Sequence, residues 1–257
     1  MTVLLGFDTA THATVVGLRL ADGSTLQARD DPPAGAHPGH ATRLLAMAAG
    51  LLDNAGLRWS AVGRIAVGVG PGRFTGLRVG IATARGLAQS LAAELVGVST
   101  LHALALGAAE RSGADAAGRG TIAVIDARRG EAFAAAHPAV GGGEIEFSGA
   151  LGALELESIV VEIERRGGPA GEQWQAVGDG AVRFAAELRE AGVSVPADDS
   201  PLHLLDAAAL CELGARAEAA PALESVLPDY RRAPDAAFAR SRARARAPEP
   251  VSPGAAS

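Results

Sequence analysis

The 257-residue sequence contains one cysteine, Cys211, so a disulfide within the chain is impossible. That usage fits a reducing, cytosolic setting. The first residues show no basic segment followed by a long apolar stretch, which argues against a signal peptide. No apolar run approaches the roughly 18 residues that a membrane-spanning helix requires. Together these absences predict a cytoplasmic protein that is not anchored in a membrane.

Positive charge is also scarce in this sequence. Lysine and arginine total 23 against 29 aspartate and glutamate residues, which gives a formal net charge of −6. The chain as a whole therefore has no electrostatic attraction to nucleic acid. With 48% hydrophobic and 20% charged residues, the composition is globular, and the length allows two small domains or one large domain.

A glycine-rich stretch at residues 68–80 is the most informative segment; it reads Gly-Val-Gly-Pro-Gly-Arg-Phe-Thr-Gly-Leu-Arg-Val-Gly. The apolar run before it, residues 64–69, predicts a buried strand, and the Ala- and Leu-rich run after it, residues 81–91, predicts a helix. Thr75 is expected to cap this helix, because its hydroxyl can accept a hydrogen bond from the first turn.

The turn between that strand and helix contains Gly70, Pro71 and Gly72. Free N–H groups at the start of a helix can bind phosphate, and the helix dipole assists. However, no Lys-Ser or Lys-Thr follows the glycines, and their spacing differs from that of a dinucleotide-binding turn. From the residues alone, a tight turn without a ligand is the favoured interpretation.

The helix after the turn carries a ridge of small residues spaced four apart, which would let another helix approach closely. These are Gly76, Gly80, Ala84 and Ala88. In one interpretation, this ridge packs on the chain's own sheet. In the other, Leu77, Ile81 and Leu87 pack on the sheet, and the ridge is free to contact a partner.

The order of predicted elements divides the chain into two parts. A three-stranded meander, then helix, strand, helix and strand up to residue 98, predicts a mixed sheet covered by helices. A shorter series follows the glycine-rich linker at residues 113–120. Its predicted helices cover residues 155–166, 181–191 and 202–219. We expect a first lobe at 1–112, an abbreviated second lobe at 113–200, a C-terminal helix and extended segment at 201–235 that pack back on the first lobe, and a disordered tail at 236–257.

Six segments, at residues 6–10, 40–45, 68–80, 97–104, 125–131 and 228–231, resemble the TsaB family and occur in the family's order. The Gly-Pro-Gly-Arg-Phe-Thr-Gly-Leu-Arg string is the most specific of them. Members of this family are the dimerisation subunit of the bacterial complex that makes threonylcarbamoyladenosine in tRNA.

This resemblance implies an α/β, two-lobed actin-like ATPase (ribonuclease H-like) fold, in which a nucleotide lies between the lobes. It places six residues at vestigial positions of that cleft, and no cofactor is expected. These are Asp8 and Thr9 at the first phosphate hairpin, Gly70 and Gly72 at the second phosphate region, and Gly178 and Gly180 at a shortened adenosine loop.

The resemblance also indicates that the chemistry is missing. The family's catalytic paralogue carries two histidines four residues apart, a spacing that puts both on one helical face around a metal. The aligned positions here are Thr100 and Leu104, and His102 stands between them without a partner. His37 and His40 flank a Pro-Gly loop with no evident third ligand. We therefore expect no metal site and no catalytic residue.

Two charged features have both a structural and a functional interpretation. Asp126, Arg128, Arg129 and Glu131 surround a predicted hairpin turn, where a solvated turn with weak ion pairs is expected. The arginines at 240–246 form a basic tail that could touch RNA phosphates weakly, although a solubilising end is the preferred interpretation.

The function implied by the resemblance is that of a non-catalytic partner subunit. It would bind the catalytic paralogue of the TsaD type and the associated small ATPase subunit, form a homodimer when alone, and meet tRNA only through the complex. Two other classes remain open. One is an actin-like enzyme, either a small-molecule kinase or a metal glycopeptidase. The other is a regulatory homodimer unrelated to tRNA.

The predicted partner surface combines the helix of residues 40–54 with the helix of residues 75–91. Each has more apolar or small surface than one buried face needs, and two such pairs could form a four-helix bundle. The residues expected at this surface are Leu44, Leu45, Met47, Leu51, Gly76, Gly80, Ala84 and Ala88.

Overall fold

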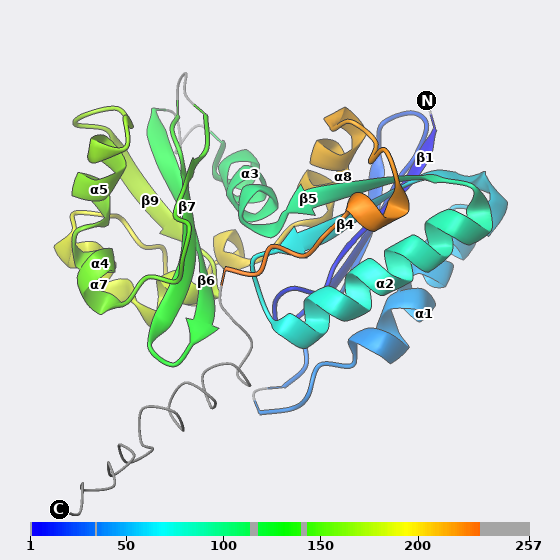
Figure 1. Cartoon of the computed structure of the whole chain (residues 1–257), viewed down its shortest axis with the longest axis horizontal. Coiled ribbons are helices and arrows are strands. Elements are labelled where there is room, and N and C mark those ends of the chain that lie inside the picture. The colour runs from blue at the N-terminus through cyan, green and yellow to red at the C-terminus, as the bar shows by residue number, and fades with distance from the viewer. Residues whose placement is uncertain (1, 34, 114–117, 140–142, 232–257) are drawn as a thin grey trace, which may run out of the picture.

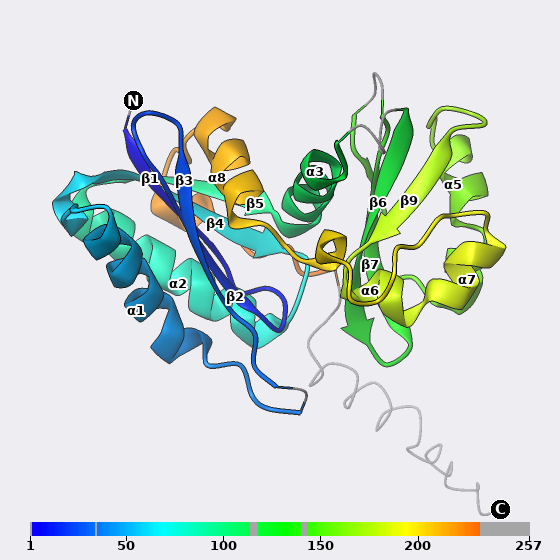
Figure 2. The same cartoon turned by 180° about the vertical axis from the view of Figure 1, so that it is seen from behind.

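The computed structural model describes residues 2–33, 35–113, 118–139 and 143–231. Two β-sheets stand side by side, and helix α3 (Thr100–Ser112) lies between them (Figure 1). Helices α1 (His40–Asn54) and α2 (Phe74–Leu91) cover the far side of the first sheet (Figure 1; Figure 2). Short helices cover the far side of the second sheet, so helices lie outside and between the two sheets.

The first sheet has five strands in the order β3-β2-β1-β4-β5. Its central strand, β1, pairs antiparallel with β2 and parallel with β4. Alternate residues of β1 face opposite sides, because side chains along a strand alternate. Leu4 joins the core next to α3, whereas Leu5 and Phe7 join the core under α1 and α2. The strands are β1 (Val3–Asp8), β2 (Thr14–Arg19), β3 (Thr25–Asp30), β4 (Val62–Gly70) and β5 (Glu94–Ser99).

The second sheet repeats this order in a shorter form. Its strands run β8-β7-β6-β9, so β6, β7, β8 and β9 take the places of β1, β2, β3 and β4. Again the central strand pairs antiparallel with the next strand and parallel with the last. The strands are β6 (Arg119–Arg128), β7 (Glu131–His137), β8 (Ile145–Glu146) and β9 (Gln173–Val177). This arrangement confirms the predicted two-lobed actin-like fold with an abbreviated second lobe.

Two predicted helices of the second lobe are each divided in two. The helix expected over 155–166 consists of α4 (Ala153–Glu157) and α5 (Ile159–Arg165), with Ser158 between them. The Ser158 hydroxyl donates to carbonyl groups of the preceding turn, which offers the backbone an alternative to a continuous helix. The helix expected over 181–191 is interrupted by the buried Phe184, between α6 (Asp179–Arg183) and α7 (Ala185–Glu190).

The last helix, α8 (Ala207–Arg216), is shorter than the predicted range of 202–219. The Asp206 carboxylate accepts a hydrogen bond from the Ala208 N–H at 2.8 Å, and this N-cap fixes the start of the helix. A 3-10 turn at Pro201–His203 precedes it. α8 packs on the side of the first sheet that faces α3.

The first turns of α2 and α3 begin differently. The Ser99 hydroxyl accepts from the His102 N–H at 3.3 Å and caps α3. Thr75 does not cap α2. That helix begins at Phe74 with Arg73 at the N-cap, and the N-cap side chain makes no capping hydrogen bond.

The segment that follows α8 runs along α2 and carries a 3-10 turn at Leu223–Ser225 (Figure 1). Arg85 of α2 donates to the Val226 carbonyl at 2.7 Å, and the Asp229 N–H donates to the Val69 carbonyl at 2.7 Å. The lobe limits at residues 112 and 200 stay a prediction. The expected tail at 236–257, with its arginines at 240–246, lies outside the described residues, as do residues 114–117 of the expected linker.

In the part of the chain that the structure describes, no helix has the length and apolar character needed to cross a lipid bilayer.

Candidate partner interface and interlobe site

Asp8 ends β1 and is completely buried. Its carboxylate accepts from the Ala10 N–H and from the Thr100 hydroxyl, each at 2.6 Å. The Thr100 oxygen in turn accepts from the Gly70 N–H at 3.1 Å. Burial raises the pKa of Asp8, and the Thr100 hydrogen bond opposes that shift. This network joins β1, β4 and α3, and a Cβ atom at Gly68 would overlap the Asp8 carboxylate.

Thr9 fixes the first turn of α2 against the sheet. Its hydroxyl donates to the Gly76 carbonyl at 2.8 Å. A Cβ atom at Gly76 would overlap the Thr9 carbonyl oxygen, and one at Gly80 would lie 2.5 Å from the Thr9 hydroxyl. The two glycines are therefore required for close approach of α2 to the β1–β2 turn.

The expectation that the small-residue ridge of α2 is free is wrong. Gly76, Gly80, Ala84 and Ala88 are all buried inside this chain. The two alanines belong to the core formed by Leu5 and Phe7 of β1. On α1, Leu44 and Leu51 are only 1% and 6% exposed and belong to the same core. The reason is that small residues let α2 lie close to its own sheet, while Leu77 and Ile81 are buried beside them.

A different face of α1 and α2 remains exposed. Of the residues expected at the partner surface, Leu45 is 44% exposed and Met47 is half-buried. On α2, Ala82 and Gly86 are exposed, four residues apart, and a Cβ atom at Gly86 would meet no atom within 4 Å. Sequence reasoning missed this outward ridge, because it shares the spacing and small size of the inward one.

The glycines expected at the adenosine loop pack against β6. The Gly178 N–H donates to Nδ1 of His203 at 3.1 Å, and a Cβ atom at Gly178 would overlap the Val124 carbonyl oxygen. At Gly180 a Cβ atom would lie 2.8 Å from the Ile125 carbonyl carbon. The cavity between these glycines and the β1–β2 turn, lined by residues that include Thr11, His12 and Asp179, measures about 330 Å³.

Gly70 and Gly72 belong to the first lobe, at the end of β4 and in the turn that follows. Because the second sheet repeats the order of the first, the turn equivalent to β1–β2 is the β6–β7 turn around Arg129. The turn that contains Gly70 and Gly72 is therefore not the second-lobe counterpart of the β1–β2 turn. A Cβ atom at Gly72 would crowd Ala10, so this glycine serves a close contact within the first lobe.

A cavity of about 790 Å³ lies between the start of α2 and the β6–β7 turn. It brings together residues from four of the six segments that carry the family resemblance. They include His40, Gly72, Arg73, Phe74, Asp126, Arg128, Arg129, Asp229, Tyr230 and Arg231. The Phe74 and Tyr230 ring centroids are 5.0 Å apart, and the Arg78 guanidinium lies 3.7 Å from the Phe74 ring centroid. His40 is buried, which lowers its pKa, and Nδ1 of its ring lies 2.9 Å from the Thr14 hydroxyl.

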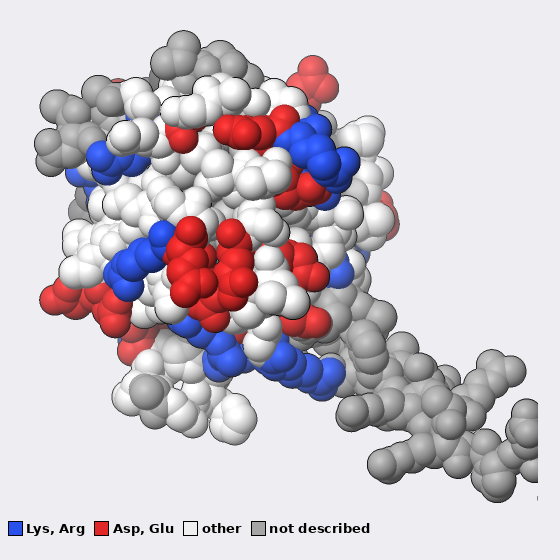
Figure 3. Space-filling model, turned by 90° about the vertical axis from the view of Figure 1, so that its left-hand side faces the viewer, with Lys and Arg blue, Asp and Glu red and all other residues white. Residues whose placement is uncertain are grey.

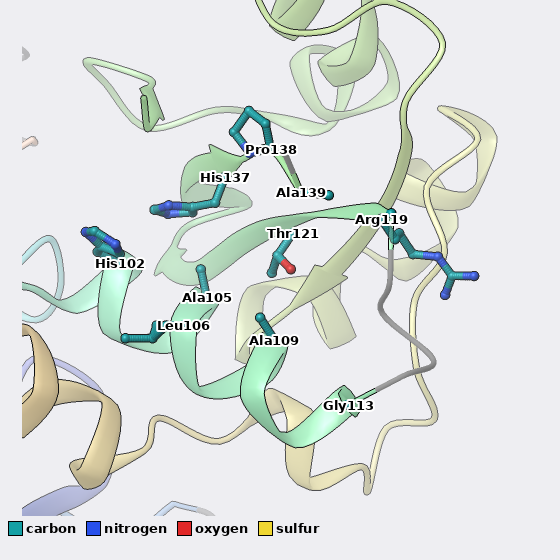
Figure 4. Close-up of a pocket in the computed structure, with 11 residues that line it drawn as sticks. His102, Ala105, Leu106, Ala109, Gly113, Arg119, Thr121, His137, Pro138 and Ala139 are labelled. Carbon is teal, nitrogen blue, oxygen red and sulfur yellow. The ribbon is translucent and has the colours of Figure 1, made fainter. Parts of the chain in front are cut away.

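A second cluster surrounds His102, which the sequence had left without a partner. Nδ1 of His102 lies 3.7 Å from the Glu144 carboxylate, and Nε2 of His137 lies 3.6 Å from the other carboxylate oxygen. The two imidazoles face each other beside a cavity of about 360 Å³, with ring centroids 4.9 Å apart (Figure 4). Burial lowers the pKa of His137 to about 3 and raises the pKa of Glu144 to about 7.

Over the described residues, no group of three or more His, Cys, Asp or Glu side chains is arranged to hold a metal ion, and this includes the cluster around His102. Thr100 and Leu104, the positions aligned with the paralogue's histidine pair, are both buried. Cys211 is buried as a free thiol, and burial raises its pKa to about 12. His37 lines the 790 Å³ cavity together with His40.

The outer face of the second lobe is charged, in contrast to the exposed ridge of α2. Acidic side chains gather there with arginines around them (Figure 3). Glu162 pairs with Arg165 at 2.6 Å and with Arg166 at 2.7 Å, and these hydrogen bonds lower its pKa to about 2. A solvated face of this kind gives little energy per ion pair.

Comparisons with known proteins agree with the fold. The family model described as "TsaD: tRNA N6-adenosine threonylcarbamoyltransferase" matches residues 32–192. The chain is 32% identical over 204 residues to the tRNA threonylcarbamoyladenosine biosynthesis protein TsaB of Escherichia coli, a match that covers 78% of this chain and 84% of that protein. The Haemophilus influenzae protein of the same name is 37% identical over 130 residues, or 51% of each chain.

A solved structure is similar as well. YeaZ from Pseudomonas aeruginosa superposes with a TM-score of 0.69 at 31% sequence identity, over 89% of this chain and 99% of that chain. The extent of these matches, taken with the two-lobed fold, shows that this chain belongs to the TsaB family.

Proposed function

We propose that this chain is a non-catalytic partner subunit for threonylcarbamoyl transfer to the adenosine next to the anticodon of ANN-reading tRNAs. It acts by binding a catalytic paralogue of the TsaD type, together with the associated small ATPase subunit, in the cytoplasm. It meets tRNA through that complex and pairs with a second copy of itself when the paralogue is absent. The name of the Escherichia coli relative supports this pathway.

The burial of the Asp8 carboxylate is the main observation in favour of a non-catalytic subunit. A carboxylate that served nucleotide or metal chemistry would have to reach the cleft, whereas Asp8 is fully buried and bonded to Thr100. Thr100 and Leu104 stand where the paralogue's histidine pair would stand. The partner therefore supplies the reacting groups, and this chain supplies a surface.

The surface that we propose for the partner is the exposed face of α1 and α2. Ala82 and Gly86 give α2 an outward ridge on which another helix can pack closely. Leu45 and Met47 of α1 add apolar area to it. The same face on a second copy would be self-complementary, which accounts for a homodimer.

Three matched substitutions test this surface. Ala82→Glu should leave the chain folded and abolish association, because it places a charge on the outward ridge. Ala84→Glu should unfold the chain, because it buries an unpaired charge in the core. Ala186→Glu, on an exposed position of α7, is the control and should change neither property. Thermal unfolding measures whether each variant is folded. Light scattering after size-exclusion chromatography measures whether it associates. A folded Ala82→Glu variant that still pairs with the paralogue would contradict the proposed interface.

An actin-like enzyme is the alternative function, since one similar structure is described as resembling "peptidase YEAZ". We expect the purified chain alone to hydrolyse neither ATP nor peptide above background. Activity that survives repurification and is lost in Asp8→Ala would favour the enzyme.

A further inference from the structure

The cavity of about 790 Å³ between α2 and the β6–β7 turn is not used by the partner surface proposed above. Four of the six segments that carry the family resemblance contribute to its lining, although they lie far apart in the sequence. The residues they bring include four arginines against two aspartates, together with the rings of Phe74 and Tyr230; the charged residues are Arg73, Arg128, Arg129, Arg231, Asp126 and Asp229. This composition differs from the acidic chain as a whole, whose net charge is −6.

The β6–β7 turn that forms one wall has an uncommon backbone. Arg128 and Arg129 both have left-handed conformations, with φ angles of 66° and 58°. Left-handed backbone is unfavourable for a residue with a long side chain, and Gly or Asn is usual there. Such strain concentrates where a side chain is needed for a contact. Both arginines line the cavity, and the Arg128 guanidinium also lies 3.6 Å from the Asp126 carboxylate, so phosphate would bind in exchange for that contact.

The opposite wall offers flat apolar surface. The rings of Phe74 and Tyr230 form a pair, and the Arg78 Nε donates to the Tyr230 hydroxyl at 3.1 Å. Tyr230 is 41% exposed. Exposed aromatic rings beside arginines suit unpaired bases and phosphates, because bases stack on rings and guanidinium groups bind phosphate oxygens.

We propose that this cavity binds a single-stranded segment of RNA, with phosphates at Arg128 and Arg129 and a base against the Phe74–Tyr230 pair. The proposal rests on the proposed function, in which the complex acts on the anticodon loop of tRNA. It makes this chain a direct contributor to RNA binding within the complex.

The main test uses the full chain assembled with the catalytic paralogue and a labelled anticodon stem–loop of an ANN-reading tRNA. The double variant Arg128→Asn/Arg129→Asn removes both charges while allowing the left-handed backbone. We expect its thermal midpoint to be unchanged or higher and its affinity for the stem–loop to fall about tenfold or more. Because two phosphate contacts are lost, the slope of log affinity against log salt should decrease by about 1.4. Arg189→Asn, on α7 and away from the cavity, is the control and should leave both quantities unchanged.

A second variant separates base contacts from phosphate contacts. Tyr230→Ala should weaken stem–loop binding about fivefold or more without changing the salt slope, since stacking does not depend on counterions. The proposal is overturned if the double variant assembles and binds the stem–loop as the parent chain does. It is also overturned if Arg189→Asn causes an equal loss, or if AMP competes fully with the stem–loop, which would indicate a mononucleotide pocket.

Assembly is measured by light scattering in the same samples, so the two proposals can fail separately. If the parent chain does not assemble with the paralogue, the proposed function fails. The same titration on the isolated chain then decides the RNA site.

Discussion

The β1–β2 turn of the first lobe and the β6–β7 turn of the second lobe occupy equivalent places in two sheets of the same strand order. Each begins with an aspartate that accepts from the backbone N–H two residues later. The Asp8 carboxylate accepts from Ala10 at 2.6 Å, and the Asp126 carboxylate accepts from Arg128 at 2.8 Å. The local hydrogen bonding of the two turns is therefore alike.

Their surroundings are opposite. Asp8 is fully buried and bonded to Thr100 of α3, so the first turn is part of the core. Asp126 pairs with the Arg183 guanidinium at 3.1 Å near the surface, and the second turn projects arginines into a cavity. The first turn is closed by its own buried contacts, and the second carries charged side chains. The shared topology thus gives the two turns similar backbone hydrogen bonds, whereas their side chains and surroundings give them different roles.

The largest difference between the two turns should come from glycine substitutions. Gly68→Ala places a methyl group on the Asp8 carboxylate and should lower the free energy of unfolding by about 3 kcal/mol or more. Gly130→Ala, in the second turn, meets no atom within 4 Å but has a φ of +80°, so it should cost about 1–2 kcal/mol. Urea unfolding of both variants measures the difference, and equal losses would contradict it.

A smaller loss is expected from Thr100→Val. This change keeps the shape but removes the hydroxyl that donates to Asp8 and accepts from Gly70. Leaving those buried groups without partners should cost about 1–3 kcal/mol of unfolding free energy. Thr75→Val, at an exposed position, should stay within about 0.5 kcal/mol. If both variants unfold at the same urea concentration, the Asp8 network does not stabilise the first turn.

The smallest effect should appear only as a pH dependence, at the contact between α3 and the second lobe. The pKa of Glu144 is raised from 4.5 to about 7, so its contribution to stability is full below pH 4.5 and lost as pH rises through 7. The pKa of His137 is lowered from 6.5 to about 3, so its contribution is full above pH 6.5 and lost as pH falls towards 3. The two trends cancel between pH 4.5 and 6.5.

Glu144→Gln should remove one of these trends. The unfolding free energy of this variant, relative to that of the parent chain, should then rise with pH between 4.5 and 6.5 with a slope of about one proton. Glu146→Gln, at the neighbouring acid that also raises the pKa of Glu144, should move the loss of the Glu144 contribution to lower pH without removing it. A Glu144→Gln profile parallel to that of the parent would exclude the shared titration.

Much of the fold was predictable because its signals are local. The stretch of residues 68–80 specifies a strand, a turn and a helix through its apolar run, its glycines and its following alanines. The repeat of strand patterns after residue 118 predicts a second lobe. The sequence could not decide which face of α2 points towards the sheet. The ridge that contains Gly76 and Ala84 and the ridge formed by Ala82 and Gly86 both consist of small residues four positions apart. Only packing on Thr9 and on β1 decides which ridge faces inward.

The candidate site was less predictable, because its residues come from distant segments. Arg73, Arg128 and Tyr230 come from three separate segments of the sequence, and only the folded chain places them around one cavity. His102 likewise looked solitary, since its partners His137 and Glu144 follow it by 35 and 42 positions.

The apolar core around helix α3 joins the two lobes and limits how they can move. Leu4 and Val96 of the first sheet, Leu101 of α3, and Ile125 and Val177 of the second sheet all belong to one continuous apolar core. Opening the lobes like a hinge would expose this core to water, at a cost that grows with the apolar area uncovered. The shared core therefore opposes lobe opening, and any partner would act on this chain at its surfaces rather than through lobe closure.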